Sequence, residues 1–162
     1  MRRRLFAAGL AIALMPIGAS SAAAQPVCRQ SPVQDLLPSV VGPMMGADPA
    51  WLVSDSAQWS SADAPVKTLW VVRRTDQPVR ITGQRVDGPG TAMFRRGSDE
   101  PTESLDVPSA ALQSAWPGGA SREVTSAYAF LPSHVFYPSP GCWRFEVRVG
   151  DQVVPIVREV RR

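Results

Sequence analysis

The chain has 162 residues, with 17 basic and 14 acidic side chains, a single histidine and two cysteines. Its length suits one domain. One histidine excludes a multi-histidine zinc site within the chain. The sequence has no P-loop, no dinucleotide-binding glycine motif and no EF-hand loop, which argues against nucleotide or calcium sites of those kinds.

Residues 1–24 have the pattern of a signal peptide. Three arginines precede a short apolar core, and the segment ends in three alanines, a sequence typical of a cleavage site. The core is too short for a comfortable membrane span. We therefore expect cleavage after Ala24 and a periplasmic or secreted protein, with an uncleaved anchor as the alternative. The arginines also fit a twin-arginine signal loosely, but ordinary Sec export is favoured because no cofactor motif calls for folded export.

Loss of the signal peptide changes the charge of the chain. Its three arginines leave with it, so the 17 basic residues fall to 14, equal to the 14 acidic ones. The formal net charge becomes zero. Binding to nucleic acid or to an anionic membrane therefore loses its electrostatic support.

Cys28 and Cys142 are the only cysteines. In an exported protein this number predicts one disulfide, which would tie the N-terminal segment to the last hairpin. A redox role is disfavoured because the chain has no C-x-x-C motif. Lipid attachment at Cys28 is not expected, because residues 25–27 lack the small side chains that lipoprotein processing requires.

Residues 25–48 are rich in proline, glycine and small side chains, and they are predicted to form an irregular segment with one helical turn near residues 33–37. Residues 49–162 are predicted to form the domain. Short apolar runs separated by Gly/Pro turns indicate an antiparallel β-sandwich of about seven strands. These strands are expected at 49–53, 67–74, 79–87, 91–94 and 105–108 and on both sides of Gly150-Asp151, with a helical turn at 109–114 and residues 122–136 leading into the last hairpin.

The terminal stretch, residues 137–160, has the clearest local pattern. Between Trp143 and Val149 apolar residues alternate with charged ones, which is typical of a strand with one buried and one exposed face. Gly150-Asp151 suits a two-residue type II′ turn, and this turn predicts a register. The register places Val147 opposite Val154, Phe145 opposite Ile156 and Trp143 opposite Arg158.

Other local features add four structural expectations. A cation–π contact is expected between Trp143 and Arg158. Pro155 cannot donate a backbone hydrogen bond, so the last strand is expected at a sheet edge or with a bulge. The apolar run 69–72 predicts a central strand that is covered on both faces. Gly83 predicts a bulge or the close approach of another backbone.

The run Pro138-Ser139-Pro140-Gly141-Cys142-Trp143, followed by an alternating strand and a Gly-Asp turn, resembles the C-terminal signature of a group of bacterial exported proteins of unknown function. The resemblance is specific over Tyr137–Asp151 and loose over residues 67–136. It implies an immunoglobulin-like β-sandwich. It brings no catalytic residues with it, so function stays open.

No catalytic residue, cofactor or metal site is predicted. Ser133-His134 has no nucleophile context of the G-x-S-x-G kind, and a lone histidine in a loop is usually a polar surface or capping residue. Met44-Met45 together with His134 could supply copper ligands, but methionine pairs more often serve packing. A hydrolase is therefore the least favoured function.

Trp59 and Trp116 lie in polar or Gly/Pro-rich loops and are the candidate binding residues. Exposed aromatic rings of this kind bind sugars or peptides, while partial burial against neighbouring loops is the alternative. The sequence thus favours a non-enzymatic exported module that binds a protein partner in the cell envelope or extracellular space. A glycan-binding or small-molecule-binding domain is the alternative.

Overall fold

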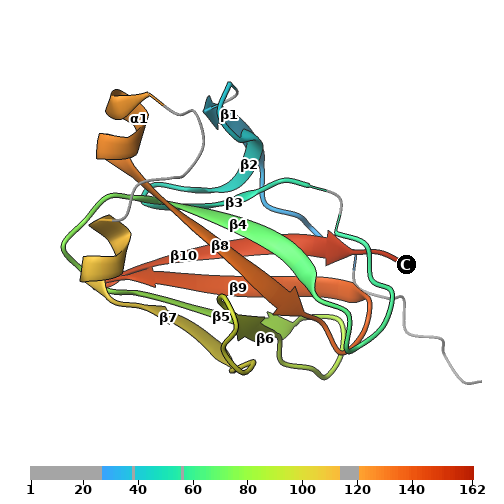
Figure 1. The fold of residues 1–162 in the computed structure, drawn as a ribbon. Coiled ribbons are helices and arrows are strands. Elements are labelled where there is room, and N and C mark those ends of the chain that lie inside the picture. The colour runs from blue at the N-terminus through green and yellow to red at the C-terminus, as the bar shows by residue number, and fades with distance from the viewer. Residues whose placement is uncertain (1–26, 38, 56, 114–120) are drawn as a thin grey trace, which may run out of the picture.

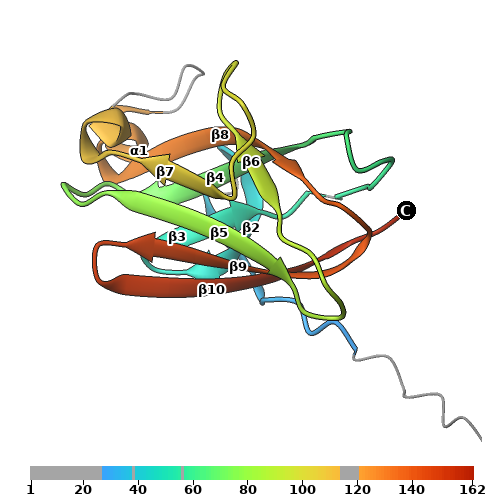
Figure 2. The same cartoon turned by 90° about the horizontal axis from the view of Figure 1, so that it is seen from below.

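The computed structural model describes residues 27–37, 39–55, 57–113 and 121–162. The predicted signal peptide and Trp116 lie outside these ranges. Within them, ten strands form two antiparallel sheets that pack face to face (Figures 1 and 2). The predicted all-β antiparallel sandwich is confirmed, with ten strands in place of about seven.

The six-stranded sheet, called the large sheet below, has the order β1-β2-β3-β4-β8-β6. Its strands are β1 (Val33–Leu37), β2 (Gly42–Ala47), β3 (Ala50–Val53), β4 (Val66–Arg73), β6 (Met93–Arg95) and β8 (Tyr128–Phe136). The four-stranded small sheet has the order β10-β9-β5-β7. Its strands are β5 (Val79–Arg85), β7 (Ser104–Val107), β9 (Gly141–Val149) and β10 (Gln152–Val160).

Six of these strands follow the order of an immunoglobulin sandwich. β3, β4 and β8 take the positions of strands A, B and E, and β10, β9 and β5 take those of G, F and C. β6 and β7 add one strand to each sheet, beside β8 and β5, while β1 and β2 extend the large sheet beyond β3. A 3-10 helix, η1 (Ser109–Gln113), and a short helix, α1 (Arg122–Ala127), lie between β7 and β8 in the chain.

The described part of residues 25–48 is not irregular as predicted. β1 and β2 form a hairpin at the edge of the large sheet, and Val33–Leu37 is a strand rather than a helical turn. Gly42 begins β2 with a φ of +79°, a conformation that favours glycine. The local sequence signal is weak because β2 gains its second partner, β3, from outside the segment, and strand formation depends strongly on such pairing.

Residues 122–136 do more than lead into the hairpin, because they form α1 and β8. The Ser121 hydroxyl caps α1 by accepting a hydrogen bond from the Val124 N–H at 3.3 Å. In β8, Pro132 and Ser133 interrupt the apolar pattern of the sequence. The strand nevertheless buries Ser133, because the indole N–H of Trp70 donates to its hydroxyl at 3.0 Å.

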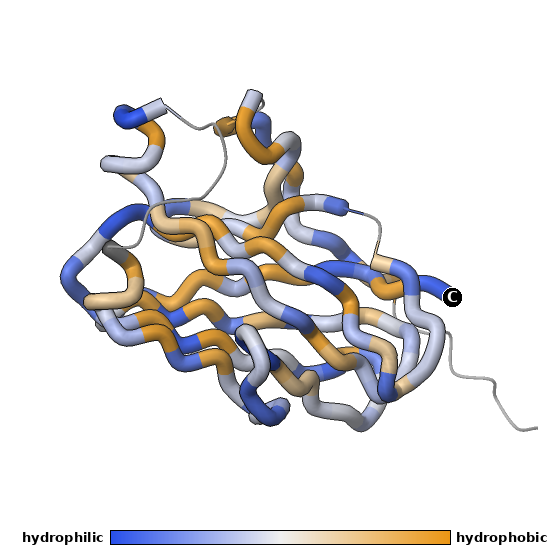
Figure 3. Tube along the Cα trace, viewed as in Figure 1, coloured by the Kyte–Doolittle hydropathy of each residue, from blue (hydrophilic) through white to orange (hydrophobic). Residues whose placement is uncertain are grey.

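β4 lies inside the large sheet and is covered on both faces, as predicted. Trp70 and Val72 face the core between the sheets, where the rings of Trp70 and Phe145 meet edge to face with centroids 5.2 Å apart. Val71 faces the opposite way, into a smaller cluster with Trp51 that the β1–β2 connection and α1 close over. Hydrophobic and hydrophilic residues accordingly alternate along many of the strands in Figure 3.

Gly83 of β5 is paired with Phe145 of β9. A Cβ atom at Gly83 would lie 2.7 Å from Cε1 of the Phe145 ring and 3.0 Å from Cβ of Ala92. Real Cβ atoms do not approach other heavy atoms so closely without displacing them. The predicted close approach is therefore present, but an aromatic ring makes it rather than another backbone.

The terminal hairpin has the predicted register at all three residue pairs. Gly150 has a φ of +56° and the residue after it has no positive φ, as the type II′ turn requires. β10 is an edge strand, as Pro155 predicted. The predicted cation–π contact is wrong: Arg158 directs its guanidinium to Asp55, and no cation–π contact within the described ranges joins it to Trp143.

The N-terminal arm, residues 27–31, is fastened along β10. Cys28 and Cys142 form the predicted disulfide, which links positions 114 residues apart. The N–H of Ser31 donates to the carbonyl of Val157, and the N–H of Val157 donates to the Ser31 hydroxyl, both at 2.9 Å. The arm thus covers part of the outer edge of β10.

The signature run, residues 138–143, leads into β9 at the end of the hairpin opposite the Gly150-Asp151 turn. Gly141 has a φ of +146°, and a Cβ atom there would lie 2.6 Å from Nε of Arg85 and 2.8 Å from Oδ1 of Asp87. These two side chains form an ion pair at 2.6 Å, and Nη1 of Arg85 donates to the Ser139 hydroxyl at 2.9 Å. The glycine of the signature therefore leaves room for the ion pair.

Candidate functional site

Trp59, one of the two predicted binding residues, is half-buried against the core. Its indole N–H donates to the carbonyl of Tyr137 at 2.9 Å, and the Arg162 guanidinium lies 6.0 Å from its ring centroid. These contacts fix the ring in one place. A role for Trp59 in binding stays a prediction, as does one for Trp116, which lies outside the described residues.

Ser133 and His134 do not form a catalytic pair. They are neighbours on β8, so their side chains point to opposite faces of the sheet. The Ser133 hydroxyl is buried and accepts the hydrogen bond from Trp70. Among the described residues, no ion pair or hydrogen bond joins a carboxylate to His134, so the serine, histidine and acid arrangement is not assembled there.

Met44 and Met45 also lie on opposite faces of their strand. Met44 belongs to the outer cluster of the large sheet, while Met45 faces the core between the sheets. The two sulfur atoms therefore do not converge on one copper site with His134. Within the described residues, no group of three or more His, Cys, Asp or Glu side chains could hold a metal ion.

The outer face of the small sheet collects exposed side chains from four strands. Side chains alternate along a strand, so the inward position of Val79 and Ile81 leaves Arg80 on the outside. This outer face consists of Arg80, Thr82 and Gln84 from β5, Ser104 and Asp106 from β7, Arg144, Glu146 and Arg148 from β9, and Val153, Pro155 and Val157 from β10.

One row of the outer face crosses all four strands. Asp106 is paired in register with Arg80, Arg80 with Arg148, and Arg148 with Val153. Directly opposite residues on one face of an antiparallel pair have Cβ atoms about 5 Å apart, and like charges in such a pair are destabilising. The sheet register thus holds two arginines in unfavourable neighbouring positions.

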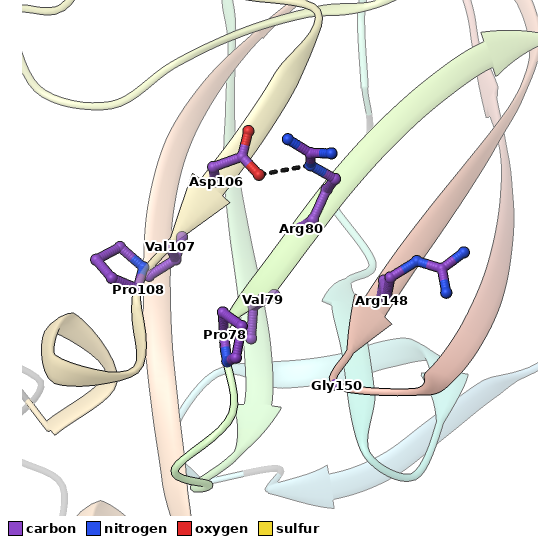
Figure 4. Close-up of a pocket in the computed structure, with 8 residues that line it drawn as sticks. All are labelled: Pro78, Val79, Arg80, Asp106, Val107, Pro108, Arg148 and Gly150. Atoms are coloured by element: carbon purple, nitrogen blue, oxygen red, sulfur yellow. Dashed lines mark hydrogen bonds and ion pairs between the residues drawn. The ribbon is translucent and has the colours of Figure 1, made fainter.

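A groove of about 410 Å³ lies at this row, where β5 begins and β7 and β9 end. Its apolar part is made by Pro78, Val79, Val107 and Pro108, and its charged part by Arg80, Asp106 and Arg148. In Figure 4 the Arg80 side chain turns toward Asp106, and Arg148 extends from the neighbouring strand in another direction. The groove therefore combines an apolar surface with one arginine from β5 and one from β9.

Of the three arginines of the outer face, two have a carboxylate partner. Arg80 binds Asp106 with an Nε–Oδ1 distance of 2.5 Å, and the Arg80 guanidinium together with the Ser104 hydroxyl holds the pKa of Asp106 below its ordinary value. Arg144 binds Glu146 at 3.3 Å. Arg148 has no ion pair and no side-chain hydrogen bond with any described residue, so its charge is left for solvent or for a ligand.

Two other hollows are less suited to a specific ligand. One of about 450 Å³ adjoins the Gly150-Asp151 turn, and its Arg73 is already paired with Asp48. Another of about 420 Å³ lies beside the arm and is lined by Glu159 and Arg161, which pair with each other. Arg73 and Arg161 are thus paired with carboxylates, unlike Arg148, while Arg162 of the second hollow lies over the Trp59 ring.

Sequence reasoning placed Arg148 on an exposed strand face but did not single it out. The alternation from Trp143 to Val149 gives its orientation directly. Its neighbours Arg80 and Asp106 come from strands distant in the chain, and only the strand pairing brings the three together. No local motif could have shown the groove.

No helix within the described ranges has the length and apolar character needed to cross a membrane. No protein-family model and no curated protein sequence matches the chain. Among solved structures, the chain is similar to the crystal structure of a presumed lipoprotein from Bacillus anthracis, with a TM-score of 0.54 and 14% sequence identity. The match covers 83% of this chain and 86% of the other, and at this identity it shows a shared fold.

Proposed function

We propose that the chain is an exported, non-enzymatic β-sandwich module that binds a protein partner in the cell envelope or extracellular space through the outer face of the small sheet. The observation that carries this proposal is the groove beside Arg148, because this arginine has no counter-charge among the described residues. Arginine beside apolar surface is a combination enriched in protein interfaces.

The disulfide supports the export part of the proposal. Disulfides persist in oxidising compartments and are rare in the cytosol. A fold shared with a presumed lipoprotein is compatible with an envelope location. The sulfur of Cys28 is held by Cys142, so we propose that no lipid is attached to it and that the exported protein is free rather than lipid-anchored.

Site-specific photo-crosslinking in the native envelope tests the binding surface. A photoreactive side chain replaces Val153, which is 40% exposed and directly opposite Arg148. We expect one discrete crosslinked species that disappears in the variant Arg148→Glu. The matched variant Arg122→Glu changes an exposed arginine on α1, which packs against the outer cluster of the large sheet, and should leave the species intact.

Two outcomes contradict the proposal. One is the absence of any crosslinked species from position 153. The other is a species of equal intensity in the Arg148→Glu variant, which would show that the partner does not use the groove. Circular dichroism of both variants shows whether the fold is retained, and we expect it to be, because Arg148→Glu removes a like-charge pair.

A small-molecule or glycan ligand is a second candidate, favoured by the groove volume of about 410 Å³. Sites for small molecules commonly have volumes of about 300–1,000 Å³. Native mass spectrometry of protein purified from its own envelope fraction separates the two candidates. A stoichiometric extra mass that is lost in Arg148→Glu favours the small ligand, and a bare monomer favours a transient protein partner.

A further inference from the structure

We propose that the groove binds an extended acidic polypeptide segment, in which a carboxylate side chain reaches Arg148 and a nearby apolar side chain lies against Pro78 and Pro108. This inference rests on the proposed function and names the chemistry of the partner. The charge, the apolar surface and the width of the groove support it.

Arg80 and Arg148 are directly opposite on the same sheet face, yet only Arg80 has a carboxylate, that of Asp106. The other cross-strand neighbour of Arg148 is Val153, which supplies no charge, and Glu146 is taken by Arg144. An arginine and a carboxylate form strong, charge-assisted hydrogen bonds, so a carboxylate from a partner suits this position.

Apolar surface lies in the groove beside Arg148. Pro78 and Pro108 are exposed, and Val79 and Val107 lie between them with almost no exposed area of their own. Proline rings expose carbon atoms and have no N–H that needs a partner. This part of the groove therefore fits an apolar side chain rather than a second charge.

The width of the groove limits the spacing between the two residues that it would bind. The groove spans β7, β5 and β9, and neighbouring strands lie about 4.8 Å apart, so its two ends are separated by roughly 10 Å. An extended chain advances about 3.3 Å per residue. The acidic and apolar residues of the bound segment should therefore be two to four positions apart.

Fluorescence anisotropy with synthetic peptides tests this inference. The probes are dye-labelled peptides of Ser/Gly background with one Glu and one Leu, separated by one, two or three residues, and matched peptides with Gln or Lys in place of Glu. We expect at least one Glu peptide to bind about tenfold more tightly than its Gln counterpart, because the contact is charge-assisted. Raising the salt concentration should reduce this preference.

Three variants of the folded protein show which residues cause the preference for the Glu peptide. Arg148→Gln should abolish the preference for Glu over Gln, and Arg122→Gln on α1 should leave it unchanged. Asp106→Asn frees Arg80 and should strengthen binding of the Glu peptide. Equal binding of the Glu and Lys peptides, or a preference that survives in Arg148→Gln, would overturn the inference.

Failure of the peptide test can be distinguished from failure of the crosslinking test. If no peptide binds but the crosslinked species from position 153 still depends on Arg148, the partner surface stands and the acidic segment is wrong. If the crosslinked species is also insensitive to Arg148→Glu, the surface itself is wrong.

Discussion

Arg158 of β10 and Asp55, which follows β3, form an ion pair with Nη2 of the arginine 3.0 Å from Oδ1 of the aspartate. The arginine side chain is 2% exposed and the aspartate side chain 50%. Nε and Nη1 of Arg158 have no hydrogen-bond partner among the described residues. Burial raises the pKa of nearby Tyr137 to about 12, although the positive charge of Arg158 acts in the opposite direction.

This geometry predicts unequal effects of removing the two partners. Asp55→Ala leaves a buried guanidinium without a counter-charge and should lower the free energy of unfolding by about 2–4 kcal/mol. Arg158→Met replaces the charge with an apolar chain and leaves a solvated carboxylate, so the change should stay within about 1 kcal/mol or be stabilising. Urea unfolding of both variants checks this, and an Arg158→Met loss as large as that of Asp55→Ala would contradict it.

Gly83→Ala should destabilise the protein, because the new methyl group meets the Phe145 ring at 2.7 Å. Overpacking of this kind costs about 1–3 kcal/mol. Gly88→Ala is the matched control, since its Cβ would come no closer than 3.3 Å to the guanidinium of Arg85, and we expect a smaller loss there. Equal unfolding midpoints for the two variants in urea would show that the ring can move aside.

The disulfide should contribute strongly to stability. Cys28 and Cys142 are 114 residues apart, and on the chain-entropy model closing so long a loop contributes about 4–5 kcal/mol. The double variant Cys28→Ser, Cys142→Ser should lose this amount in urea unfolding. Ser31→Ala, which removes one hydrogen bond of the same arm, should lose only about 1 kcal/mol. Similar losses for the two variants would show that the arm's contacts, not the covalent link, hold it.

The pKa of Asp87 lies below its ordinary value. Burial acts to raise this pKa, but hydrogen bonds from the Arg85 side chain and from the backbone N–H of Cys142 outweigh it. A lowered pKa in the folded state stabilises the protein above the unfolded value of about 3.9, and the contribution is lost as the pH falls through the lower folded pKa. Stability should therefore decrease in acid below about pH 4.

Carboxyl NMR titration checks this prediction directly. The midpoint for Asp87 should lie below about 3.9 in the native protein. It should rise in Arg85→Gln and stay unchanged in Arg144→Gln, which removes an arginine of the outer face. A native midpoint at or above 3.9 would contradict the prediction.

The sequence by itself determined the features whose interacting residues are close along the chain. The alternation after Trp143 and the Gly150-Asp151 turn together specify the hairpin register, because a two-residue turn leaves one way for its strands to pair. The apolar run 69–72 indicated a strand covered on both faces, because side chains on both faces of such a run are apolar and need burial. The two cysteines left one possible intramolecular disulfide.

Tertiary structure decided what depends on partners distant in the chain. β2 is a strand because β3 pairs with it, and Trp59 is held by the carbonyl of Tyr137, 78 residues away. The groove beside Arg148 exists because β5, β7 and β9 align in one register. Side-chain patterns along one strand show which face is exposed, but the residues that become neighbours across strands follow from pairing and packing of the whole chain.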